Sequence, residues 1–195
     1  KIDTVVLDKT GTITRGVPAV TDIFALNPID ERELLGIIAS GEIKSEHPLG
    51  RAVVKAAEAW GIPLEAVANF KALPGQGISC DLGNETWLVG NERLAESLGL
   101  DISPFFVQKN RCEEEGKTVM LAFNGGRLSG MVAVADTVKE NAVQAVSELR
   151  QMGLAIYMLT GDREKTARAI AEQVGITNVI AEVLPRDKAE EVQKL

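Results

Sequence analysis

Strand and helix patterns alternate from residue 138 to the end of the chain, and this alternation constrains the fold more than any other feature. The alternating segments are, in order, a helix over 138–152, a strand over 154–159, a helix over 163–174, a strand over 178–183 and a helix that begins at Pro185. Strands separated by helices form parallel crossover units. The apolar run 2–7 has the same strand pattern. We therefore expect a parallel α/β sheet to which both ends of the chain contribute.

The middle of the chain has antiparallel signals instead. Short β-like runs occupy 67–89, where "CDLGNETWLV" places Gly83 and Asn84 at a two-residue hairpin turn. The stretch "TVMLAFNGGRLSGMVAV" predicts a second hairpin with residues 124–126 at its turn. Before these hairpins, apolar residues at helical spacing predict a helix over 48–60.

These patterns predict an α/β fold in two parts. A parallel, Rossmann-type domain is split in the sequence into residues 1–22 and 128–195, and an α+β domain with an antiparallel sheet is inserted over 23–127. The chain begins on a strand and stops inside a helical pattern, so we expect it to be part of a longer protein.

Composition limits the partners and the compartment. The chain has 28 acidic and 21 basic residues, and the net charge of −7 argues against a nucleic-acid partner. Cys80 and Cys112 are 32 residues apart without a C-x-x-C pattern, which favours reduced thiols and a cytosolic location. No apolar run approaches the roughly 18 residues that a membrane helix needs, and no signal peptide opens the chain.

Several reactive side chains follow the predicted parallel strands. Asp8 ends the first strand, and "TGD" places Thr160, Gly161 and Asp162 after another, directly before a helix. Lys188 follows a third. Ligands of open parallel sheets collect at the carboxyl ends of the strands. An anionic carboxylate, a hydroxyl beside a helix N-terminus and a lysine at one edge predict phosphoryl transfer to Asp8.

The motifs "DKTGT" (Asp8–Thr12), "TGD" and the later lysine resemble those of P-type ATPases, which belong to the haloacid dehalogenase superfamily. The specific seven-residue form DKTGT-[IL]-T is complete here as Asp8–Thr14. The resemblance implies that Asp8 accepts the γ-phosphoryl group of ATP and that Lys9 lies beside it. It also implies that Asp8 and Thr10 bind Mg²⁺, with a third ligand in a "GDG-x-ND" segment beyond Leu195.

The insert resembles the nucleotide domain of heavy-metal-transporting members. The resemblance rests on "SEHPL" (Ser45–Leu49), "GQG" and the "GN" that follows Val89. It implies that Glu42 and His47 hold the adenine of ATP and that glycines let the backbone approach the nucleotide. The implied nucleotide-binding residues are Glu42, His47, Gly75, Gly77, Gly90 and Asn91.

Thr10 indicates which reaction such a site performs. In the phosphatase branch of the superfamily, the residue two after the nucleophile is a second aspartate that acts as acid and base. A threonine hydroxyl cannot serve as that base near neutral pH, so an aspartyl phosphate at Asp8 should persist. A persistent intermediate suits a pump, which needs time to couple the phosphorylated state to a conformational change. The resemblance implies that a separate actuator domain then assists hydrolysis.

Several candidate residues also have purely structural interpretations. His47 precedes Pro48 and could do no more than mark a helix start, and Glu42 could be an exposed helical acid. Thr160 and Asp162 could serve merely as helix caps. Asp136 could touch nucleotide, lie at the interdomain connection or cap a helix, and Trp60 and Trp87 are expected in the core.

The resulting hypothesis is the ATP-binding and phosphorylation unit of a heavy-metal pump. The chain would lie at the cytoplasmic face of a membrane, beside the membrane and actuator domains of the same protein. "SEHPL" favours copper over zinc or cadmium. Arg163 stands where the family commonly has Asn, and without "GDG-x-ND" we expect nucleotide binding with little phosphorylation. The alternatives are a free-standing phosphatase or phosphomutase with a large cap, and a non-catalytic nucleotide-binding module.

Overall fold

The structure, a computed structural model, describes residues 2–45, 47–162, 164–184 and 186–193 and divides the chain into two compact units. Unit 1 comprises Lys1–Val17, Glu113–Lys117 and Asp136–Leu195, and unit 2 comprises Pro18–Cys112 and Thr118–Ala135. The junctions at 17/18 and 135/136 lie within the long strands β2 (Thr14–Ala25) and β7 (Arg127–Val138). The boundaries predicted from the sequence, 22/23 and 127/128, fall in the same two strands.

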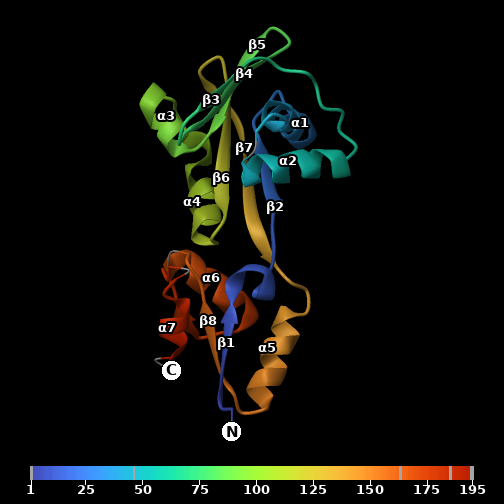
Figure 1. Ribbon diagram of the computed structural model, residues 1–195. Coiled ribbons are helices and arrows are strands. Elements are labelled where there is room, and N and C mark those ends of the chain that lie inside the picture. Colours follow the sequence, from blue (N-terminus) through green and yellow to red (C-terminus); the bar gives the residue numbers. More distant parts are fainter. Residues whose placement is uncertain (1, 46, 163, 185, 194–195) are drawn as a thin grey trace. The chain divides into compact units, whose positions relative to one another are not determined.

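Unit 1 contains the predicted parallel sheet (Figure 1). Its strands are β1 (Thr4–Asp8), β8 (Ala155–Leu159) and β9 (Asn178–Ile180), in the order β1-β8-β9. Both neighbouring pairs are parallel, and the register places Asp8 opposite Leu159. The predicted fold class, a split parallel α/β domain with an antiparallel insert, is confirmed.

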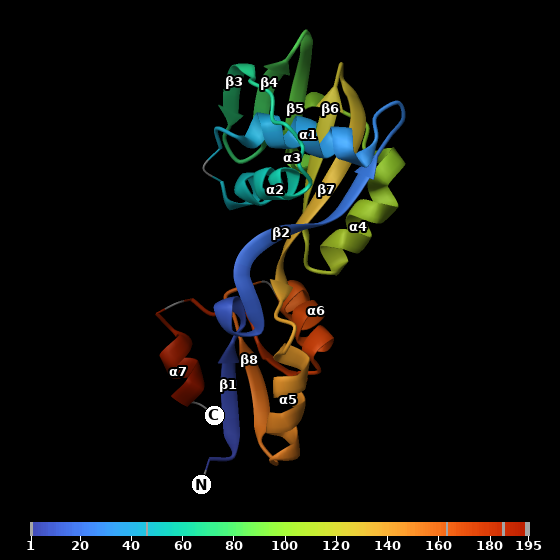
Figure 2. The same cartoon turned by 90° about the vertical axis from the view of Figure 1, so that its right-hand side faces the viewer.

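Helices α5 (Ala142–Gln151) and α6 (Glu164–Val174) cover one face of this sheet. Figure 2 shows helix α7 (Lys188–Gln193) on the opposite side. The core joins Ile156 and Met158 of β8 to Val146 of α5 and Ile170 of α6. Helix α5 starts later than predicted because β7 continues to Val138.

Unit 2 is built on a six-stranded sheet of order β2-β7-β6-β5-β4-β3. The strands not yet introduced are β3 (Ala68–Leu73), β4 (Gly77–Leu82), β5 (Glu85–Gly90) and β6 (Thr118–Asn124). Both predicted hairpins are confirmed: Gly83 and Asn84 join β4 to β5, and Gly125 and Gly126 join β6 to β7.

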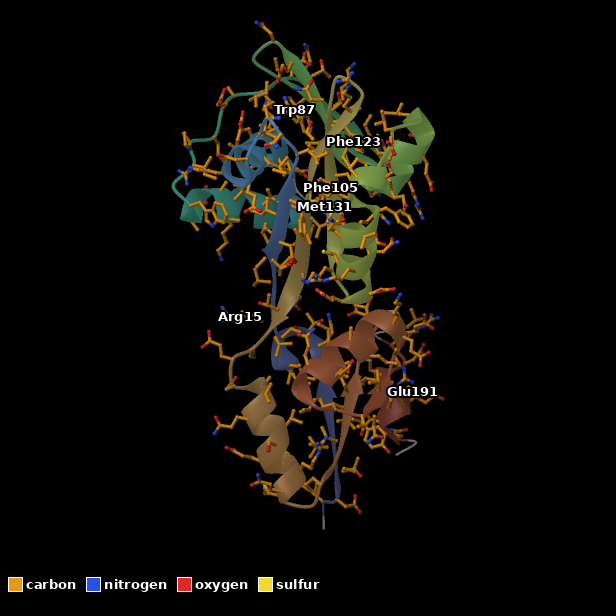
Figure 3. All side chains as sticks on the ribbon, turned by 180° about the vertical axis from the view of Figure 1, so that it is seen from behind. Arg15, Trp87, Phe105, Phe123, Met131 and Glu191 are labelled. Atoms are coloured by element: carbon orange, nitrogen blue, oxygen red, sulfur yellow. The ribbon has the colours of Figure 1, made fainter. Side chains whose placement is uncertain are left out.

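Helices cover both faces of this sheet. Helices α1 (Glu31–Glu42) and α2 (Pro48–Ala59) pack on one face, and α3 (Glu92–Leu98) and α4 (Phe106–Glu114) pack on the other, with the short 3₁₀ turn η2 (Ser103–Phe105) before α4. Side chains alternate along β6, as the period of a strand requires. Met120 and Ala122 join the core beneath α1 and α2, whereas Val119, Leu121 and Phe123 join the other core. Phe105, Phe123 and Met131 of the second core are labelled in Figure 3.

The expectations for tryptophan and cysteine can be checked directly. The predicted core position of Trp60 is wrong: it follows the last turn of α2 as C-cap and is 47% exposed, whereas Trp87 is buried as predicted. Cys80 and Cys112 are both buried thiols, as expected. Among the described residues, no helix has the length and apolar character needed to cross a membrane.

Candidate functional site

The phosphate-site candidates of unit 1 lie at the carboxyl ends of β1 and β8. Asp8 is the last residue of β1 and is half-buried. The chain then reverses in the turn η1 (Lys9–Ile13), where Gly11 has φ +78°, a conformation that glycine adopts without strain. The Lys188 ammonium donates a hydrogen bond to the Asp8 carboxylate. Two predicted residues 180 positions apart are therefore in direct contact.

The "TGD" segment is held in place by β9 and by Lys9. Thr160 is 2% exposed, its amide donates to the Ile180 carbonyl over 3.0 Å, and its hydroxyl accepts from the Asp162 amide over 3.1 Å. The Lys9 ammonium lies 2.8 Å from the Asp162 carboxylate. A Cβ on Gly161 would lie 3.2 Å from the Val183 carbonyl oxygen. The Asp162 amide is thus engaged with the Thr160 hydroxyl.

Asp136 holds the start of β2. Its carboxylate accepts from the Thr14 hydroxyl over 2.5 Å and from the Gly16 amide over 2.9 Å. It lies in β7, and Asn141 is the N-cap of α5, so the helix-cap interpretation of Asp136 is wrong. The interpretation that places it at the connection between the two units agrees with these contacts. The roles of Thr14 and Gly16 were not found from the sequence, because their partner is more than 100 positions away.

A cavity of about 420 Å³ in unit 2 gathers the second group of candidates. All six predicted nucleotide residues line it: Glu42, His47, Gly75, Gly77, Gly90 and Asn91. Phe70, Ile78, Val89 and Met120 add apolar wall. A mainly apolar wall with a few polar groups is typical of small-molecule sites. A larger hollow of about 920 Å³ in the same unit is lined by none of the predicted site residues.

Glu42 and His47 form the polar corner of this cavity. Glu42 is 5% exposed, so it is not an exposed helical acid. Burial raises the pKa of its carboxyl, while a hydrogen bond from Ser45 and the nearby His47 act in the opposite direction. His47 is exposed and is the N-cap of α2, with its Nδ1 accepting from the Leu49 amide over 3.2 Å. Because Nδ1 is an acceptor, the proton of the neutral ring lies on Nε2, which can donate to a ligand.

The fold itself explains why three positions of the cavity wall are glycine. A Cβ on Gly77 would lie 2.0 Å from the Val89 carbonyl oxygen, and one on Gly90 would lie 2.2 Å from the Gln76 carbonyl oxygen. Both contacts are with backbone, so neither position accepts a side chain without moving a strand or a loop. Gly75 faces open space and instead has φ +70°. Close approach of a ligand is therefore not needed to explain Gly77 or Gly90.

Asn91 uses both ends of its side-chain amide. Its Oδ1 accepts from the Leu94 amide over 3.3 Å and thereby caps α3, and its Nδ2 donates to the Gly75 carbonyl over 2.9 Å. Arg163, which departs from the pattern of the resembled family, lies outside the described residues.

A parallel sheet that presents an aspartate at the end of its first strand, a threonine at the end of its neighbour and a lysine on a later helix is the arrangement of haloacid dehalogenase-like proteins. The family model "haloacid dehalogenase-like hydrolase" matches residues 2–195, and the chain belongs to this family.

Individual relatives are more specific. The chain is 43% identical over 195 residues to the copper-exporting P-type ATPase of Bacillus subtilis, covering 100% of the chain and 24% of that protein. It is 44% identical over 196 residues to the probable copper-exporting P-type ATPase of Archaeoglobus fulgidus, with coverages of 100% and 24%. The chain thus spans about a quarter of the length of the curated relatives it matches.

Solved structures agree with these relatives. A zinc-transporting PIB-type ATPase in the E2.Pi state superposes with a TM-score of 0.91 at 34% identity, over 100% of this chain and 31% of that one. The catalytic domain of the CPx-ATPase CopB-B gives 0.67 at 25% identity, over 100% and 66%. The predicted resemblance to the catalytic region of heavy-metal P-type ATPases is confirmed.

Proposed function

We propose that this chain is the ATP-binding and phosphorylation unit of an ATP-driven heavy-metal pump, with copper as the favoured transported metal and zinc or cadmium as the alternatives. The observation that carries the proposal is the single cavity onto which all six motif residues of unit 2 converge. Those residues lie between positions 42 and 91 of the chain, and their convergence supports one shared ligand.

In this proposal, the cavity of unit 2 binds the adenine end of ATP. The purine packs against the apolar wall that includes Phe70, and the Nε2–H of His47 donates to a ring nitrogen. Glu42 accepts from the exocyclic amino group of adenine. The buried Glu42 carboxyl and the orientation of His47 by the Leu49 amide support these roles, because both groups are held in place before a ligand arrives.

In the same proposal, Asp8 is the nucleophile of unit 1. Lys188, already hydrogen-bonded to Asp8, offsets negative charge as a phosphoryl group approaches. Thr160 offers its hydroxyl to a phosphoryl oxygen. Lys9 keeps the Asp162 carboxylate in place. Asp8 and Thr10 offer oxygen ligands to Mg²⁺, which suits an ion that needs only one or two carboxylates beside phosphate oxygens. When bound, Mg²⁺ supplies positive charge beside the phosphoryl group.

The remaining partners belong to the parent pump. We propose that the chain lies at the cytoplasmic face of a membrane and works with the membrane and actuator domains of the same protein, and that the transported ion binds in the membrane domain. The catalytic-domain similarities and the quarter-length match to copper-exporting relatives support this arrangement.

A titration with a non-hydrolysable ATP analogue tests the proposal. His47 is the only histidine, so its ring signals can be followed in an NMR spectrum without assigning others. We expect the Nε2 resonance to shift and saturate with ATP analogue and with adenosine, but not with triphosphate alone. A His47→Gln variant should bind more weakly, whereas Asn84→Ala, at an exposed hairpin turn, should bind as the wild type does. Unchanged ring signals at saturating nucleotide would refute the adenine assignment.

A further inference from the structure

The loop that carries Gly75 is tied to the end of β5. Residues 74–76 connect β3 to β4, and the first residue of β4, Gly77, is paired with the last residue of β5, Gly90. Gly75 and Gly77 both have positive φ, so the loop depends on residues with unusual backbone freedom. Such a loop loses conformational entropy when a ligand orders it.

Two hydrogen bonds converge from the β5–α3 junction onto this loop. The Asn91 side chain donates to the Gly75 carbonyl over 2.9 Å, and the Asn91 amide donates to the Gln76 carbonyl over 2.9 Å. The Ser97 hydroxyl of α3 lies 3.5 Å from the Gln76 side-chain oxygen. Asn91 therefore supplies both hydrogen bonds, one from its backbone and one from its side chain.

The other end of the Asn91 amide is fixed as well. Its oxygen accepts from the Leu94 amide over 3.3 Å, so the nitrogen must point toward Gly75. Both polar atoms of the side chain are thus engaged within the protein, and both bonds agree on the orientation of the amide. The second N–H and the second oxygen lone pair of the amide remain, so the two bonds fix the orientation of the side chain without using all of its hydrogen-bonding capacity.

We propose that Asn91 is a positioning residue that acts on nucleotide binding through the Gly75 loop instead of touching the nucleotide. We call the two hydrogen bonds from Asn91 to the Gly75 and Gln76 carbonyls the clamp. The effect of the clamp on binding rests on the proposed function, but the clamp itself is a property of the chain without ligand. By holding the Gly75 and Gln76 carbonyls, Asn91 keeps the loop ordered, so that less entropy is lost when the cavity is filled.

Two substitutions isolate the clamp from the helix cap. Asn91→Asp keeps an oxygen that can cap α3 and, when ionised, has no hydrogen to donate to the Gly75 carbonyl. Asn91→Ser keeps a capping oxygen on a shorter side chain that lacks the amide N–H. Asn84→Asp is the control, because it makes the same change of amide to carboxylate at an exposed hairpin turn outside the cavity. Binding of ATP is measured by calorimetry, and amide hydrogen exchange is measured on the full chain without ligand.

We expect both Asn91 variants to bind ATP about three- to tenfold more weakly, the range that corresponds to the loss of one neutral hydrogen bond. The amides at positions 76 and 91 should exchange faster in both, while Asn84→Asp changes neither property. Weaker binding with unchanged exchange would overturn the proposal in favour of direct contact, and no change in either would also overturn it. If the wild type binds no ATP, the proposed function fails, and the exchange data alone then decide whether the clamp exists.

Discussion

Gly77→Ala should destabilise unit 2 for a reason that does not involve any ligand. The new Cβ would lie 2.0 Å from the Val89 carbonyl oxygen and 2.5 Å from the Gly90 Cα, both of which are backbone atoms of the paired strand. Overpacking of this kind costs about 1–3 kcal/mol. A non-glycine residue at φ +151° adds strain of about 1–3 kcal/mol. We expect a total loss of about 2–6 kcal/mol, which is a large part of the stability of a small domain.

Urea unfolding followed by tryptophan fluorescence measures this loss. Both tryptophans of the chain, Trp60 and Trp87, belong to unit 2, so the signal reports the unfolding of that unit. Gly75→Ala is the matched control, because Gly75 lines the same cavity and has φ +70° but faces open space. Only the backbone strain remains there, and the expected loss is about 1 kcal/mol.

The comparison is made without nucleotide, because either variant could weaken binding for more than one reason. Equal losses in the two variants would refute the argument: they would mean that β4 and β5 relax around the new methyl group. The explanation that Gly77 is needed for close approach of the nucleotide would then regain support.

Three further predictions concern other residues. Burial raises the pKa of Glu42, so the folded chain holds this proton more tightly than the unfolded chain, and the stability of unit 2 should fall as pH rises from about 4.5 through the raised pKa. Glu42→Gln should flatten this dependence in urea midpoints measured across that range; an unchanged slope would contradict it. Asp136→Ala removes the acceptor of the Gly16 amide and leaves the Thr14 hydroxyl only the Lys9 carbonyl at 3.1 Å, and it should cost unit 1 about 1–2 kcal/mol, with faster exchange of the Gly16 amide as the check. In the proposed parent pump, Thr10→Asp should shorten the lifetime of the aspartyl phosphate by about 10²-fold or more, because a carboxylate can act as a general base; decay of the labelled phosphoenzyme measures this, and Thr10→Asn should not accelerate it.

The sequence was most informative where one local pattern permits one structure. An apolar run that ends in Asp8, followed later by strands alternating with helices, can satisfy its hydrogen bonds in a parallel sheet, and the crossovers then bring Asp8 next to "TGD". The pair Gly83 and Asn84 fixed a hairpin in the same way, because few residues tolerate the turn.

Helices α3 and α4 were missed because their patterns mislead. Helix α3 has only seven residues. In α4 the apolar Phe106 and Val107 are 52% and 75% exposed, while Lys109 is 3% exposed and pairs with Glu92 of α3 over 2.8 Å. A helix that buries a lysine and exposes a valine cannot be recognised from apolar periodicity, because its polar contact depends on a residue of another helix.

The cavity shows a related limit. Motifs identified the residues that gather around it, but not what each one does there. Glu42 has no sequence signal for burial, and the bond from Asn91 to Gly75 joins residues 16 positions apart through a loop whose shape the sequence does not specify. A motif identifies which residue belongs to the site. The role of that residue depends on which hydrogen bonds it has already formed within the folded chain.

The turn after Asp8 shows why the chemistry of Thr10 can be considered separately from the fold. The bonds that shape η1 come from its neighbours: the Gly11 amide donates to the Thr14 hydroxyl over 3.4 Å, the Lys139 ammonium donates to the Gly11 carbonyl over 2.6 Å, and Gly11 supplies the positive φ. Thr10 itself is exposed and has extended backbone angles that any residue adopts. An aspartate fits this position as well as a threonine does, so the shape of the turn does not determine which of the two is present. Under the proposed function, the choice between a base and a hydroxyl at this position sets how long a phosphorylated Asp8 lasts, and a threonine suits a pump that must change conformation before it releases phosphate.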